Sequence, residues 1–195
     1  MMRRGREAGF FVTYNHPVWS LEDRRDYSGY EGMHAMEVCN WGCVVDGYDD
    51  YVPQVYDDLL RQGKKIYCVG TDDNHNAIED SFGAFTVIKA EKLDYKTITD
   101  AMLAGNFYAS MAPEIHELSI EDGTLHIETS PCEKIMIQSA CRRTRVIYAD
   151  SPNAALTKAD IDLKRFAQAG YVRVIVFDNR GRRAWSQPIY IDAQN

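Results

Sequence analysis

Two short segments of this chain end in side chains that could bind a divalent metal ion. His16 follows the apolar run that ends at Asn15 and precedes Pro17. Asp73 and His75 follow the apolar run KKIYCV, within the segment GTDDNH. Neutral imidazole and carboxylate groups are natural ligands for Zn, Mn or Fe. The Asp-x-His spacing lets both side chains leave an extended backbone on the same side, so Asp73 and His75 form a geometrically sensible pair of ligands.

Both segments lie at the C-terminal ends of predicted strands, which together with their exit loops cover residues 9–17 and 64–76. In parallel α/β folds, ligands and metal ions gather at the C-terminal ends of the strands. We therefore expect His16, Asp73 and His75 to converge, with donor atoms within about 4 Å of each other if they share one metal ion. The alternative is a surface turn rich in Asp and Asn, in which His75 is solvated.

Glu37 and Asn40 lie near the end of another predicted strand, over residues 34–40, and are candidates for substrate or metal binding. Side chains alternate along an ideal strand, so positions 37 and 40 point to opposite faces. At most one of the two is then expected to face the site. His34 is the first residue of this run and is expected at the surface, and His126 is expected on the surface of a sheet in the C-terminal part.

Alternating strands and helices are predicted for residues 1–112. The remaining elements of this part are a strand over residues 83–90 and helices over residues 48–63 and 93–106. Pro53 suits the first turn of the earlier helix, and Asp94 is a suitable N-cap for the later one. Residues 1–9 resemble the last turn of a helix closed by Gly9. Strands and helices in alternation predict parallel strands joined by crossovers.

The pattern changes near Ala112–Pro113. Residues 114–130 form two alternating runs around Asp122-Gly123, which is a hairpin signal. Further strands are predicted over residues 133–140, 144–150 and 171–191. Residues 156–166 fit either a strand or a short helix. Residues 113–195 are therefore expected to form an antiparallel sheet or a small sandwich.

The composition narrows the class of protein. The chain has 195 residues, a net charge of −7 and a pI of about 5.2, which argues against a general nucleic-acid-binding protein. No apolar run approaches the roughly 18 residues that span a bilayer. The five cysteines are odd in number and scattered, so they predict no disulfide framework. Together with an N-terminus too polar for a signal peptide, these features favour a cytoplasmic protein that does not associate with membranes.

The two metal-binding segments resemble motifs of the PHP family, which is named for polymerase and histidinol phosphatase. NHPVW resembles the family's late His-Pro strand end, and GTDDNH resembles its closing Gly-(Ser/Thr)-Asp-x-His motif. The resemblance implies that His16, Asp73 and His75 are metal ligands and catalytic residues. Asp72 is the alternative to Asp73, because the segment has one residue more than the shortest form of the motif. The implied activity is hydrolysis of a small phosphorylated substrate through water activated by Zn, Mn, Fe or Mg ions.

The resemblance also implies a fold. Residues 1–112 would be the second half of a distorted (β/α)7 barrel, followed by a small antiparallel β-sandwich-like domain over residues 113–195. The family's His-x-His strand, further His ligands and a bridging Glu would precede His16, and no histidine does so here. We therefore expect a C-terminal portion of a PHP protein with an incomplete metal site and little or no phosphatase activity alone. The alternative is a non-catalytic, oligomeric structural or binding remnant.

A barrel interrupted in this way would leave the strand over residues 9–17 with an unpaired edge. Phe10, Phe11 and Val12 would lie on that edge or on the barrel interior that is uncovered with it. Exposed strand edges and apolar patches pair with other chains, and a two-fold arrangement is the simplest closed solution. The sequence therefore predicts a homodimer or a higher even oligomer.

Overall fold

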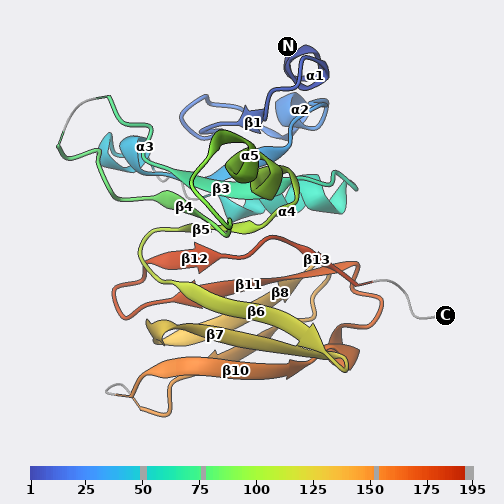
Figure 1. Ribbon diagram of the computed structural model, residues 1–195, viewed down its shortest axis with the longest axis vertical. Helices are drawn as coiled ribbons and strands as arrows, with labels where there is room; N and C mark the ends of the chain where they lie inside the picture. Colours follow the sequence, from blue (N-terminus) through green and yellow to red (C-terminus); the bar gives the residue numbers. More distant parts are fainter. Residues whose placement is uncertain (49–51, 76–77, 152–153, 192–195) are drawn as a thin grey trace. The chain divides into compact units, whose positions relative to one another are not determined.

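The computed structural model describes residues 1–48, 52–75, 78–151 and 154–191 (Figure 1). The chain divides into two compact units, Met1–Ala109 (unit 1) and Ser110–Asn195 (unit 2). The boundary expected from the sequence was Ala112–Pro113. Within the described residues, no helix combines the length and the apolar character that crossing a bilayer requires.

The predicted half of a (β/α)7 barrel is wrong. Among the described residues, strands account for 36% and helices for 20%, and the sheets are largely antiparallel. The parallel sheet of unit 1 has three strands in the order β1-β2-β3, and they span Thr13–Tyr14, Ala35–Asn40 and Tyr67–Thr71. A barrel needs a closed ring of long strands covered by helices. Here β1 has two residues, and the longest described helices have nine.

The central strand β2 explains why this small sheet forms. All six of its residues are buried, and it pairs in parallel with β1 on one side and β3 on the other. Parallel strands that are covered on both faces are typically apolar throughout. The helix α4 (Pro53–Arg61) provides part of that cover, because it contacts β2 and buries Tyr56, Leu59 and Leu60. Pro53 lies in its first turn, as expected.

The remaining elements that begin in unit 1 are short, and the last of them ends at the first residue of unit 2. They are α1 (Met2–Glu7), α2 (Arg24–Tyr27), α3 (Trp41–Val45), β4 (Phe85–Ile88), α5 (Tyr95–Leu103) and β5 (Phe107–Ser110). The side chain of Asp94 caps α5 by accepting the N–H of Thr97 at 2.9 Å, which confirms the predicted N-cap. β4 lies beside β3, since the Thr86 hydroxyl bonds to both the N–H and the carbonyl of Gly70.

Unit 2 is built from two antiparallel sheets (Figure 1). One has the order β10-β7-β6, with bounds Leu156–Asp162, Thr124–Cys132 and Ile115–Glu121. The other places β8 (Lys134–Ser139) between β9 (Arg145–Tyr148) and β11 (Tyr171–Phe177), and β11 also pairs with β12 (Arg183–Trp185) and β13 (Ile189–Tyr190). The ambiguous segment 156–166 contains both structures, because β10 is followed by a 3-10 helix at Leu163–Phe166.

The N-terminal edge of unit 1 is less exposed than expected. Phe10 is 67% exposed, but Phe11 is partly buried against the core cluster of Ala35, Val69 and Phe107. β1 is an edge strand of the three-stranded sheet, so among the described residues only one of its sides is paired with another strand. The homodimer stays a prediction, and light scattering at micromolar concentration would test it by measuring the mass of the protein in solution.

His34 is partly buried in unit 1, where it packs against Phe11 and Val12. Its ring stacks on Phe11 at a centroid distance of 5.0 Å, and its Nδ1 accepts the Val12 N–H at 3.0 Å. Burial, with a smaller contribution from the charge of Arg6, lowers the pKa of the imidazole below its usual range. The neutral ring is therefore the form that holds Val12.

We expect the free energy of unfolding to decrease as the pH falls below about 6.5, the ordinary histidine pKa. The unfolded chain takes up this proton more readily than the folded chain, because the folded pKa of His34 is lowered. The contribution of neutral His34 to the free energy of unfolding is therefore complete above the pKa of the unfolded chain, and it is lost as the pH falls through the folded pKa. Urea unfolding between about pH 8 and about pH 5.5 measures it. His34→Asn, which retains an acceptor for Val12, should flatten this dependence, and an equal slope in both proteins would contradict the assignment.

Candidate functional site

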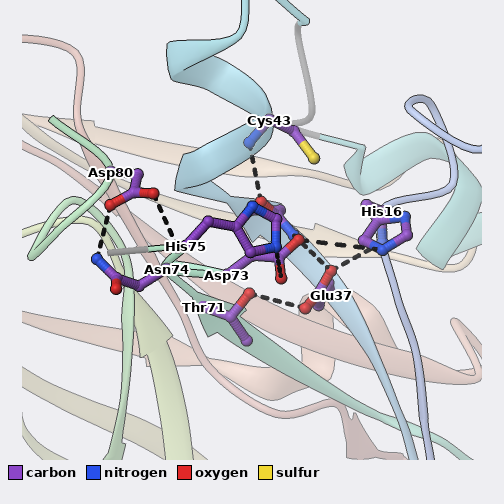
Figure 2. Close-up of polar contacts among 9 residues, drawn as sticks. His16, Glu37, Cys43, Thr71, Asp73, Asn74, His75 and Asp80 are labelled. Atoms are coloured by element: carbon purple, nitrogen blue, oxygen red, sulfur yellow. Dashed lines mark hydrogen bonds and ion pairs between the residues drawn. The ribbon is translucent and has the colours of Figure 1, made fainter. Parts of the chain in front are cut away.

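The structure brings His16, Asp73 and His75 together. His16 follows β1, and the other two follow β3, so all three leave the same end of the parallel sheet. Figure 2 shows His16 and His75 close to the carboxylate of Asp73. His16 Nε2 lies 4.0 Å from Asp73 Oδ2, and His75 Nε2 lies 3.8 Å from Asp73 Oδ1. All three side chains line one cavity of about 430 Å³.

Asp73, rather than Asp72, is the carboxylate that faces the histidines. The Asp72 carboxylate turns away and accepts three backbone N–H groups, from Phe82, Gly83 and Ala84, at 2.5, 2.8 and 2.9 Å. Asp72, the additional residue of GTDDNH, thus has a structural role. Asp72 anchors the end of the loop that follows His75, and Asp73 is left to face the cavity.

Glu37 and Asn40 face the same side of β2, contrary to the expected alternation. Asn40 Nδ2 donates to Glu37 Oε2 at 3.1 Å and to Asp73 Oδ2 at 3.0 Å. The register of β2 against β3 shifts between Glu37 and Cys39, and such an irregularity re-aims the side chains that follow it. Neither residue is among the described residues that line the cavity, so both act on the site through other residues.

Glu37, on β2, forms hydrogen bonds with a residue that follows β1 and with residues of β2 and β3 (Figure 2). Its carboxylate accepts the backbone N–H of His16 at 2.7 Å and the Thr71 hydroxyl at 2.7 Å, besides the Asn40 amide. Burial raises the pKa of the Glu37 carboxyl, and these hydrogen bonds oppose that rise. A buried carboxylate with three donors fixes where the chain leaves β1 and β3.

The backbone is strained at two of the three converging residues. His16 has a φ of 31° and Asp73 a φ of 49°, in the left-handed region that residues other than glycine seldom adopt. Strain of this kind persists where the surrounding contacts enforce it, and it concentrates at functional sites. For His16 these contacts are the Glu37 carboxylate and Ser20, whose hydroxyl lies 3.0 Å from Nδ1. Nε2 is then the ring nitrogen that faces Asp73.

The loop that carries His75 is held through its backbone. Asp80 accepts the His75 N–H at 2.9 Å and the Asn74 amide at 2.6 Å (Figure 2). At the far end of the loop, Gly83 lies against the indole of Trp41, and Trp41 Nε1 donates to the Glu79 carbonyl at 3.0 Å. The position of His75 therefore depends on Asp72, Asp80 and the Gly83–Trp41 contact.

Replacing Asp72 with alanine is expected to lower the free energy of unfolding by about 1–3 kcal/mol, because three N–H groups lose a charged acceptor. Hydrogen exchange at Phe82, Gly83 and Ala84 should accelerate. Asp72→Asn should have a smaller effect, because its amide oxygen can still accept the two N–H groups that bond to Oδ1. Unchanged protection of these amides in Asp72→Ala would contradict this role.

Comparison with protein-family models, with curated proteins and with solved structures found no match to this chain. The resemblance to the PHP family therefore rests on the two sequence motifs alone. Among the described residues, no group of three or more His, Cys, Asp and Glu side chains is already arranged to hold a metal ion.

The sequence did not identify the apolar residues of the site. Trp19 and Val45 line the same cavity as His16, Asp73 and His75. Trp19 is 49% exposed, and its ring lies nearly perpendicular to the His16 ring at a centroid distance of 5.1 Å. Its position three residues after His16, in the turn that follows Pro17, is the signal that could have indicated this.

Proposed function

We propose that His16, Asp73 and His75 bind a divalent cation and that the cavity hydrolyses a phosphate ester. The observation that carries the proposal is the position of the Asp73 carboxylate, whose two oxygens each face a different imidazole Nε2, at 4.0 and 3.8 Å. This is a mixed nitrogen and oxygen donor set at the C-terminal ends of parallel strands, where metal sites occur.

The distances support a cation better than a hydrogen-bonded pair. In unit 2, His126 Nδ1 and Asp160 Oδ1 are 2.7 Å apart, which is a hydrogen bond. The two distances at Asp73 are too long for that. Ligands about 2.1 Å from a tetrahedral ion lie about 3.4 Å apart, so each imidazole would move about half an ångström closer to the Asp73 oxygen that it faces. His75 can make that movement, because its side chain is 82% exposed.

Each residue has a defined part in this proposal. A bound divalent cation supplies activation of water and neutralises charge on the phosphate. Asp73 provides the carboxylate ligand, and the Asn40 amide orients it. Glu37 holds the His16 backbone, and through it the direction of the imidazole. The His75 side chain lines the cavity and is largely exposed, so it can move when a substrate binds.

The phosphate ester is proposed from the likeness of NHPVW and GTDDNH to motifs of the PHP family. The cavity volume of about 430 Å³ is in the range of sites for small molecules, which favours a small substrate over a polymer. Three protein ligands can hold fewer cations than the sites of the PHP family, which have more ligands. We therefore expect slow turnover, because fewer cations stabilise the attacking and leaving oxygens.

The test starts from the 195-residue chain after removal of metal with a chelator. Zn²⁺, Mn²⁺, Fe²⁺ and Mg²⁺ are added singly, and both cation affinity and hydrolysis of 4-nitrophenyl phosphate are measured. We expect cation binding and weak, cation-dependent turnover that His75→Ala abolishes. Binding without turnover would favour a non-catalytic binding module, and absence of binding would contradict the proposal.

A further inference from the structure

We infer that this site selects phosphomonoesters whose leaving group is aromatic and carries no second negative charge, through Trp19, Val45 and Asp46. This inference rests on the proposed function and concerns the part of the substrate beyond the phosphate. It follows from which side chains share the cavity with His16 and Asp73.

The first observation is an apolar surface beside the proposed ligands. Trp19 and Val45 both line the cavity, and they are 49% and 43% exposed. The Trp19 and His16 rings are nearly perpendicular, at an interplanar angle of 74°, so the two rings do not stack face to face. Aromatic rings prefer offset-stacked or edge-on partners, which an aromatic leaving group would provide.

The second observation is the charge of the lining. Among the described residues that line the cavity are Asp46, Asp73, Glu79 and Asp80, with no Lys or Arg. Within this described lining, no Lys or Arg side chain is therefore placed to hold the phosphate. Affinity must come from the bound cation and from contacts with the rest of the substrate, and binding energy from that remote part can also serve the reaction.

The acidic lining also excludes substrates. Asp46 and Glu79 would repel a leaving group with a carboxylate or a further phosphate. Polyphosphates and nucleic acids are poor candidates for this reason. An uncharged aromatic leaving group instead meets Trp19 and Val45 without this repulsion.

The experiment measures binding of non-hydrolysable phosphonates to the cobalt(II)-loaded chain, by calorimetry and by the visible absorption of cobalt. Phenylphosphonate and methylphosphonate present the same anion to the cation and differ in their apolar part. We expect phenylphosphonate to bind about tenfold more tightly, which is the scale for burying part of one ring. Trp19→Ala should bring the two affinities close together, and Val45→Thr should narrow the gap.

Tyr95→Ala is the matched control, because Tyr95 is an aromatic residue of unit 1 that is 86% exposed and does not line the cavity. It should leave the tenfold preference unchanged. Adding a carboxylate at the para position of phenylphosphonate should weaken binding several-fold. Asp46→Asn should recover part of that loss.

The outcomes separate this inference from the proposed function. Cobalt binding with equal affinities for the two phosphonates, or a preference that survives Trp19→Ala, overturns the inference and leaves the cation site standing. If para-carboxylation has no effect, the charge selection is wrong. If the chain does not bind cobalt, the proposed function fails, and the inference fails with it.

Discussion

Replacing Asp73 with asparagine is expected to reduce the affinity for cobalt(II) or zinc(II) by more than about a hundredfold. Changing a residue that only supports a ligand typically costs 10- to 100-fold, and Asp73 is proposed as a ligand itself. Its carboxylate is the group that faces both His16 Nε2 and His75 Nε2. Asparagine keeps the size of the side chain but removes the negative charge and one acceptor oxygen, so calorimetric titration should report a loss of binding rather than of folding.

Asp160→Asn is the matched control for Asp73→Asn. Asp160 also faces an imidazole, that of His126, but the pair lies on the sheet of unit 2 and is joined by a direct hydrogen bond of 2.7 Å. Cation affinity should be unchanged in this variant. Equal affinity in wild type and Asp73→Asn would show that any bound cation lies elsewhere.

Replacing Gly83 with alanine should lower the free energy of unfolding by about 1–3 kcal/mol, the usual effect of overpacking. A Cβ atom at position 83 would lie 1.9–2.2 Å from three ring atoms of Trp41. Either the indole or the loop must move, and movement of the indole would break its hydrogen bond to the Glu79 carbonyl. Because the same loop carries His75, we also expect about tenfold weaker cation binding.

Gly29→Ala tests whether the effect is specific to that contact. A Cβ at position 29 would meet only the Asp26 carbonyl oxygen, at 3.9 Å, which is an ordinary contact. Urea unfolding of this variant should match that of wild type. If Gly83→Ala is equally stable, Trp41 must be able to leave its position at little cost.

Local signals made several elements predictable. Asp94 and Pro53 define helix starts because a side-chain cap and a fixed φ act within a few residues. The strand predicted over residues 34–40 is observed as Ala35–Asn40, since a run of apolar residues buried on both faces needs no distant information to be recognised. The convergence of His16 with Asp73 followed from the general rule for the ends of parallel strands.

The parts that failed depend on distant pairing. Whether a parallel sheet continues into a barrel is decided by strands far apart in the chain, so the motifs alone could not show that the sheet stops at three strands. The common orientation of Glu37 and Asn40 depends on a register shift against β3, which the sequence of β2 does not indicate. The partial burial of His34 likewise depends on Phe11 and Val12, more than twenty residues earlier.

The way in which Asp72 and Asp80 hold the loop has a consequence for engineering. Among the described residues, the Asp72 carboxylate accepts backbone N–H groups, and Asp80 accepts the backbone N–H of His75 together with the Asn74 amide. None of these hydrogen bonds uses the side chains at positions 78 and 82. Those positions carry Ile78 and Phe82, which are 90% and 92% exposed. A combinatorial library at position 78 would therefore vary the surface chemistry of this loop and leave these hydrogen bonds in place. At position 82 the library should be restricted to residues that tolerate the left-handed φ of 63° observed there.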